Sequence, residues 1–186
     1  MNQARQDATQ NVLRTIAWIV VIAGSSLGFS LAFACATPFV ALAAVAGSQL
    51  RARDACCAVL LAWLGNQSIG YLVLGYPRTW DSFAWGAVIG LAALAAAVLA
   101  RTTAVVPARL GARFSLAFAV SFAAYEGLLF AASFVLPSEG NAFALPIILR
   151  IFEVNIVAYL GLLVLHRLAI GVGLLRATVE ARPATV

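Results

Sequence analysis

The chain has 186 residues, of which 63% are hydrophobic, and its mean hydropathy is +0.99. This composition leaves too little polar surface to cover a soluble globule, so it excludes a soluble enzyme or binding domain. The net charge of +5 at pH 7 comes from arginine, because no lysine occurs. Basic patches interleaved with exposed aromatic residues, as found in nucleic-acid-binding proteins, are absent. The composition predicts an all-α integral membrane protein.

The apolar runs of the chain predict six transmembrane helices in a single domain, residues 1–186. The helices are expected at about 12–30, 31–50, 55–74, 82–100, 114–136 and 144–170. The first two share an apolar run, Thr15 to Leu50, that is far too long for one crossing of about 30 Å. The stretch from Gly24 to Ser30 and the residue Pro38 offer breaks within this run.

The distribution of arginine decides between five and six helices. With six helices, every arginine except Arg78 and Arg150 falls on the side that holds both termini. With five, the arginines spread over both sides and the bias disappears. The positive-inside rule therefore predicts six helices with cytoplasmic termini.

Polar residues inside the predicted helices gather in their outer halves. The sixth helix carries Arg150, Glu153 and Asn155, and the spacing of the first two places them in contact on one helix face. Ionisable groups at membrane depth normally face a protein interior or a wet cavity, so we expect an outward-facing pocket with an apolar floor. The predicted site residues are Cys35, Asn66, Gln67, Tyr71, Trp80, Trp85, Glu126, Arg150, Glu153 and Asn155.

These residues could instead have structural roles without binding a ligand. Glu126, Arg150 and Glu153 could neutralise one another between helices, and polar amides can serve as interhelical contacts. The tryptophans and tyrosines could form an interfacial belt. Cys35 could be a small buried residue, as the adjacent Cys56 and Cys57 are expected to be.

The residue types and their spacing do not indicate a catalytic site. The only histidine, His166, lies at the inner end of the sixth helix, far from Cys35 and Glu126. The sequence has no phosphate-binding loop and no metal-ligand spacing. Glu126 and Glu153 could act as acid and base, but no nucleophile accompanies them. We therefore expect no enzyme.

Three pairs of small residues have the four-residue spacing that allows close approach of membrane helices. The pairs are Gly24 with Gly28, Ala32 with Ala36, and Gly86 with Gly90. Such a face is compatible with docking of a second membrane subunit.

The architecture resembles the substrate-binding S-components of energy-coupling-factor (ECF) vitamin transporters, most closely the cobalamin-binding type of Gram-negative bacteria. The motifs that carry the resemblance are Cys35-Ala36-Thr37-Pro38-Phe39 and the stretch from Asn66-Gln67 to Trp80. The Ala-x-x-x-Ala coupling motif of the family is missing from the first helix, where Gly24-x-x-x-Gly28 is the nearest equivalent.

The resemblance implies a multi-pass protein of the bacterial inner membrane that captures a vitamin-like molecule. A transmembrane coupling subunit and ATPases would be its partners. It would carry no cofactor of its own, cobalamin would be the transported ligand, and Cys35 would be the ligand of the cobalt ion. The alternative is a membrane scaffold or assembly protein in which a buried Arg/Glu network only holds helices together.

Overall fold

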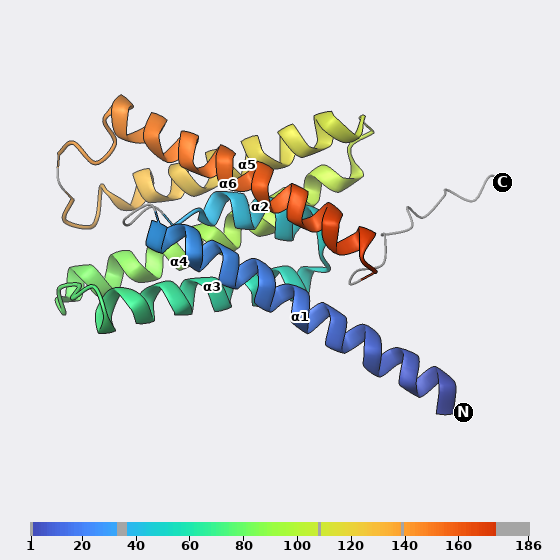
Figure 1. Cartoon of the computed structure of the whole chain (residues 1–186). Helices are drawn as coiled ribbons and strands as arrows, with labels where there is room; N and C mark the ends of the chain where they lie inside the picture. Colours follow the sequence, from blue (N-terminus) through green and yellow to red (C-terminus); the bar gives the residue numbers. More distant parts are fainter. Residues whose placement is uncertain (1, 33–36, 108, 139, 174–186) are drawn as a thin grey trace.

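The computed structural model describes residues 2–32, 37–107, 109–138 and 140–173, and the regular structure of these residues is entirely helical (Figure 1). The elements are α1 (Asn2–Ala32), α2 (Phe39–Gln49), α3 (Ala52–Leu72), α4 (Trp80–Thr102), the 3-10 turn η1 (Thr103–Val105), α5 (Leu110–Ala132) and α6 (Leu145–Gly171). The predicted all-α fold class is confirmed.

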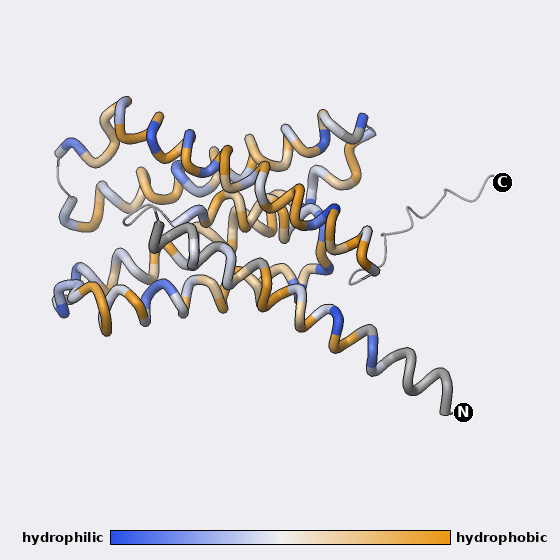
Figure 2. The backbone as a smooth tube through the Cα atoms, viewed as in Figure 1, coloured by the Kyte–Doolittle hydropathy of each residue, from blue (hydrophilic) through white to orange (hydrophobic). Residues whose placement is uncertain are grey.

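Four helices, α3 to α6, are long and apolar enough to cross a membrane. Their outward surfaces carry many large exposed apolar side chains, such as Leu64, Leu91 and Leu160. Hydrophobic residues dominate the central parts of these helices, and hydrophilic segments gather toward the bundle ends (Figure 2). The chain therefore has the character of a multi-pass membrane protein.

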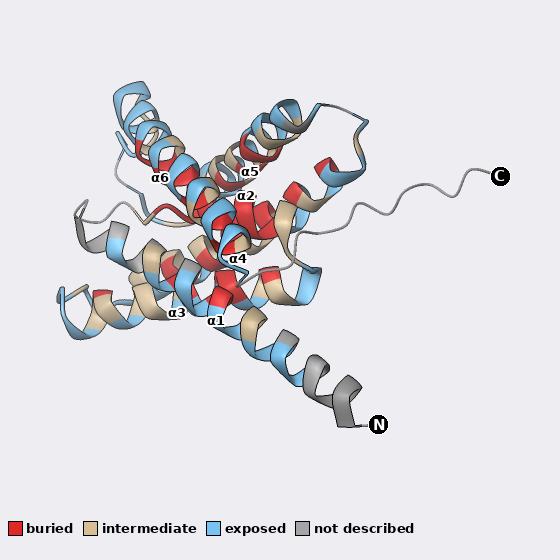
Figure 3. Cartoon of the chain, turned by 45° about the vertical axis from the view of Figure 1, so that its right-hand side comes forward, coloured by how far each residue is buried: buried red, intermediate tan, exposed pale blue. Residues whose placement is uncertain are grey.

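The second helix differs from the prediction. α2 has 11 residues and is about 16 Å long, roughly half of a hydrocarbon core of about 30 Å. Every residue from Phe39 to Gly47 is buried, because α3, α4, α5 and α6 all contact this helix. Figure 3 shows it as the most continuously buried element. The predicted helix over 31–50 is therefore replaced, in the described residues, by a half-length helix at the centre of the bundle.

Small residues allow α2 to lie this deep. A Cβ atom added to Gly47 would collide with the carbonyl oxygen of Ala97 and come within 2.8 Å of the Cβ of Ala100. The α4 face turned toward the interior consists of alanine and glycine. Close backbone approach of this kind is the usual packing mode between membrane helices.

The first helix also differs from the prediction. α1 continues through Gly24 and Gly28 to Ala32, because glycine and serine weaken a helix but leave its backbone hydrogen bonds intact. Its N-terminal part projects beyond the bundle (Figure 1). α5 ends at Ala132, four residues before the predicted end, where Ser133 begins a turn.

Gly86 and Gly90 are not available to a second subunit. A Cβ atom on Gly86 would lie 3.1 Å from the side-chain amide of Gln67, and one on Gly90 would lie 2.8 Å from the Trp63 ring. The groove that these glycines open on α4 is therefore filled by α3 of the same chain.

Candidate functional site

A cavity of about 390 Å³ lies at the end of the bundle where α2 begins. Its walls come from the residues before α2, the second half of α3 and the first half of α4, and from α5 and α6. Five predicted site residues line it: Asn66, Gln67, Tyr71, Trp85 and Asn155. Among the described residues, none that lines the cavity is charged.

The position of the cavity follows from the start of α2. Pro38 precedes the helix, and its side chain cannot accept a hydrogen bond from the first helical turn. Asn155 of α6 supplies the missing acceptor, because its Oδ1 accepts the backbone N–H of Ala41 at 3.1 Å. Its Nδ2 donates to the carbonyl oxygen of Ile151 at 2.9 Å, which fixes the amide orientation. A buried asparagine thus caps a helix distant in sequence.

The opposite end of α2 is capped from α4. The guanidinium of Arg101 donates from Nη1 to the carbonyl oxygen of Leu50 at 2.7 Å. A cation at this end and an acceptor at the N-terminus both match the helix dipole. The dipole of α2 therefore has its positive end at the cavity and its negative end beside Arg101.

Three polar contacts cross the cavity wall. The hydroxyl of Thr37 donates to Oδ1 of Asn66 at 2.6 Å. The hydroxyls of Tyr71 and Ser82 lie 3.0 Å apart. The Nε2 of Gln67 donates to the carbonyl oxygen of Gly86 over 3.5 Å. Since a glutamine side chain has two N–H donors and a carbonyl acceptor, this one long bond uses a small part of its capacity.

Aromatic rings form one wall of the cavity. Tyr71 stacks on Phe83 with 4.8 Å between ring centroids and meets the edge of Tyr76 at 5.8 Å. Tyr76 can lie this close to α3 because Gly70 has no side chain, and a Cβ atom there would collide with the Tyr76 ring. A second cavity of about 220 Å³ continues from this wall between α3 and α4.

Trp85 connects the cavity to the loop that follows α5. Its indole Nε1 donates to the carbonyl oxygen of Pro137 at 2.8 Å, while the side chain lines the cavity. Trp80, at the start of the same helix, is 67% exposed and does not line the cavity. The two tryptophans predicted as site residues therefore have different positions.

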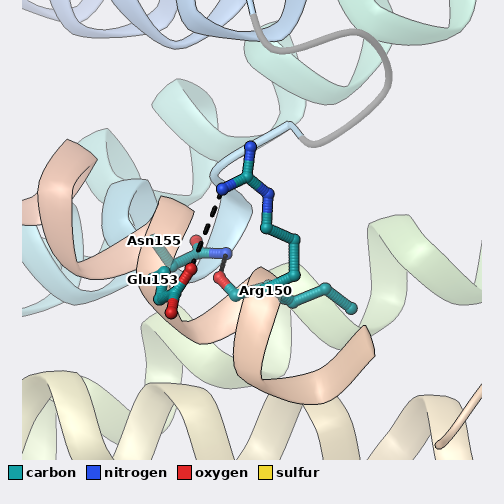
Figure 4. Close-up of polar contacts among 4 residues, drawn as sticks. Arg150, Glu153 and Asn155 are labelled. Atoms are coloured by element: carbon teal, nitrogen blue, oxygen red, sulfur yellow. Dashed lines mark hydrogen bonds and ion pairs between the residues drawn. The ribbon is translucent and has the colours of Figure 1, made fainter. Parts of the chain in front are cut away.

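The expectation that the side chains of Arg150 and Glu153 face a protein interior or a wet cavity is wrong. The expected contact is present, with 3.7 Å between Nη1 and Oε2, but the two side chains are 69% and 67% exposed. Figure 4 shows this pair on α6 with Asn155 nearby. Because Glu153 lies only two positions before Asn155, it occupies a different face of the helix. The pair points out of the bundle, and Asn155 points in.

Glu126 does not join this pair. Its Oε1 atom is buried and has no hydrogen-bond partner among the described residues, and it does not line the cavity. The buried Arg/Glu network of the scaffold interpretation is thus not formed in the described part of the chain. Cys35 lies outside the described residues.

Nine further residues line the cavity and were not predicted as site residues: Thr37, Phe39, Tyr76, Ser82, Gly86, Ile89, Tyr125, Leu129 and Ile151. Helical periodicity could have identified Tyr125, because Ala117, Ser121 and Tyr125 follow one another at four-residue steps and all are buried. Tyr76 belongs to the turn between α3 and α4, where no periodic signal exists, and Ser82 lies in the first turn of α4.

His166 lies far from the cavity, as predicted. It is 11 residues beyond Asn155 on α6, which corresponds to about 16 Å along the helix. It is buried against Trp18 of α1, with 5.3 Å between ring centroids. The described residues contain no cluster of three metal-ligating side chains.

Comparison of this chain with protein families, curated proteins and solved structures gives no match.

Proposed function

We propose that this chain is a membrane-embedded binding protein for a small uncharged solute. The observation that carries the proposal is the cavity of about 390 Å³ at the N-terminus of α2, with amides, hydroxyls and aromatic rings in its walls. Ligand sites are commonly cavities of roughly 300–1,000 Å³ in which a few polar groups fix the orientation of the ligand on a largely apolar surface.

The lining indicates the chemistry of the ligand. No charged side chain among the described lining residues offers a counter-ion, and the positive end of the α2 dipole disfavours a cation. Gln67 can donate and accept hydrogen bonds at the edge of a ligand. The rings of Tyr71, Tyr76 and Trp85 suit a flat conjugated body. We therefore expect a neutral planar molecule with peripheral hydrogen-bonding groups.

The transport role is a further part of the proposal. The arginine distribution favours cytoplasmic termini, so the cavity would face the outside of a bacterial inner membrane. A vitamin-like molecule would be captured there and taken up with a coupling subunit and ATPases, as the resemblance to S-components implies. The volume favours a ligand smaller than cobalamin, because a corrinoid is far too large to be enclosed in about 390 Å³.

Ligand screening of the purified protein in lipid nanodiscs tests the proposal. A bound ligand at 100 times its Kd stabilises the folded state by about 2.7 kcal/mol, which is readily measured as a rise in Tm. The panel contains uncharged aromatic vitamins, with cobalamin followed in parallel by its visible absorbance. A cobalamin shift that disappears in Cys35→Ser would assign that ligand and that residue.

Two tryptophans of α4 provide a matched pair of variants. Trp85→Phe removes an indole from the cavity wall, and Trp80→Phe changes an exposed one. We expect the first to weaken binding about tenfold, which corresponds to about 1.4 kcal/mol, and the second to leave Kd unchanged. A ligand bound equally well by Trp85→Phe and by Gln67→Leu would show that this cavity is not the site.

A further inference from the structure

The outward face of α6 combines a charged pair with a regular apolar stripe. Its members follow one another at alternating spacings of three and four residues. We call this set the α6 stripe: Arg150, Glu153, Val157, Leu160 and Val164. Val157, Leu160 and Val164 are 57–60% exposed. The opposite face of α6, with Ala158 and Leu162 fully or almost fully buried, packs into the bundle.

The charged members of the stripe lie in an unfavourable position for a lipid-facing surface. α6 has 27 residues and is about 40 Å long, so it exceeds a hydrocarbon core of about 30 Å. Arg150 and Glu153 lie about 8 and 12 Å from its beginning, which places them about 3 and 7 Å inside the edge of the core when the helix is centred. Their mutual contact is a single ion pair of 3.7 Å, and both side chains remain about two-thirds exposed. Lipid tails offer such groups no hydrogen bonds.

We propose that the α6 stripe is the interface with a second copy of this chain. Two copies in one membrane have the same orientation, so they are related by a two-fold axis along the membrane normal. The three-and-four spacing is that of helices that pack side by side with a left-handed crossing, where residues at these positions meet their equivalents and the adjacent positions of the other helix. Arg150 of each copy then lies beside Glu153 of the other.

Charge complementarity is the reason for a second copy as the occupant. The stripe carries one cation and one anion three positions apart. A two-fold axis turns this single weak pair into an alternating cluster of two arginines and two glutamates without net charge. Below the cluster, the exposed valines and leucines supply an apolar contact surface. Phospholipid headgroups reach only the outer end of the stripe and could satisfy only Arg150.

A reciprocal charge exchange tests the interface. Two copies with different affinity tags are co-expressed, and their association is measured in lipid vesicles by co-purification and by counting bleaching steps at several protein-to-lipid ratios. Arg150→Glu and Glu153→Arg are each expected to lower self-association at least tenfold, because each places four like charges together. A mixture of the two variants is expected to restore it. Arg78→Glu in the α3–α4 loop controls for the change in net charge.

A disulfide measurement covers the case in which a charge variant does not fold. In a Cys35→Ser/Cys56→Ser/Cys57→Ser background, Val157→Cys is expected to form an intermolecular disulfide on mild oxidation in membranes, well above the background chain. Three results would overturn the proposal: a wild-type chain that is monomeric at high density, unchanged association in both single charge variants, or, with folded variants, loss of association that the mixture does not restore. Where a charge variant does not fold, absence of the Val157→Cys disulfide above background would overturn the proposal.

Discussion

Replacement of Asn155 by alanine probes the connection between α2 and the cavity. In the wild-type protein, Oδ1 of Asn155 accepts the N–H of Ala41 at 3.1 Å, and both residues are at least 97% buried. The variant leaves a buried N–H group in the first turn of α2 without its acceptor. Because Pro38 cannot cap this turn through its side chain, the described residues next to α2 provide no side-chain cap that replaces the lost bond.

Three magnitudes bound the expected effect. Loss of one partner of a buried hydrogen bond costs about 1–3 kcal/mol, and loss of an N-cap costs about 0.5–2 kcal/mol. Interhelical hydrogen bonds in membrane proteins average about 0.6 kcal/mol and reach about 1.7 kcal/mol. Since the adjoining cavity can admit water to the exposed N–H, we expect Asn155→Ala to lower the free energy of unfolding by about 1–2 kcal/mol.

Equilibrium unfolding in mixed micelles measures this loss, with Asn141→Ala as the matched control. Asn141 lies in the exposed loop between α5 and α6, so its replacement is expected to change the free energy by less than about 0.5 kcal/mol. We also expect ligand binding to weaken in Asn155→Ala alone, because α2 forms part of the cavity wall. Equal unfolding curves for the two variants would refute the capping role of Asn155.

Three further predictions concern the bundle. Gly47→Ala is expected to destabilise the protein by about 1–3 kcal/mol through a clash with the α4 backbone. Gly24→Ala has no atom within 4 Å of its Cβ position and is expected to be neutral or stabilising by up to about 1 kcal/mol. Equal thermal unfolding of the two variants would contradict the packing of α2 against α4. Arg101→Gln is expected to cost about 1 kcal/mol in the same assay, because it removes the cation at the C-terminus of α2. The proposed topology places the loop after α5 outside and the link between α4 and α5 inside. In sealed right-side-out vesicles, an impermeant maleimide added outside is therefore expected to label Ser138→Cys and to leave Ala104→Cys at the native-cysteine background. The reverse labelling pattern would show that the topology is inverted.

The helical architecture could be predicted because hydrophobicity and length define membrane helices almost by themselves. The four helices α3 to α6 coincide closely with apolar runs in the sequence. α2 could not be predicted at its true length, because the run from Thr15 to Leu50 contains no polar residue that marks a membrane boundary. Gly24 to Ser30 and Pro38 both indicated breaks, but α1 continues through the former, and a proline does not reveal how deep in the bundle a helix begins.

The cavity was predictable in part, because depth along a helix follows from residue number but direction around the helix does not. Asn66, Gln67 and Tyr71 point inward, and all are in the cavity wall. Arg150 and Glu153 lie only about 8 and 3 Å from Asn155 along the helix axis, but they occupy the outer face of α6. The sequence carries this difference weakly, since both faces of a helix in a membrane are mostly apolar.

The half-length α2 explains why polar side chains gather at this end of the bundle. A helix that begins inside a membrane protein exposes backbone N–H groups, which must find acceptors in protein or water. Asn155 meets this need by capping Ala41, so part of the polarity is structural. Capping requires one acceptor, however, and does not require a space of about 390 Å³ or a wall built by Tyr71, Tyr76 and Trp85. The space and the aromatic wall exceed what the helix end needs, and this excess favours a ligand site.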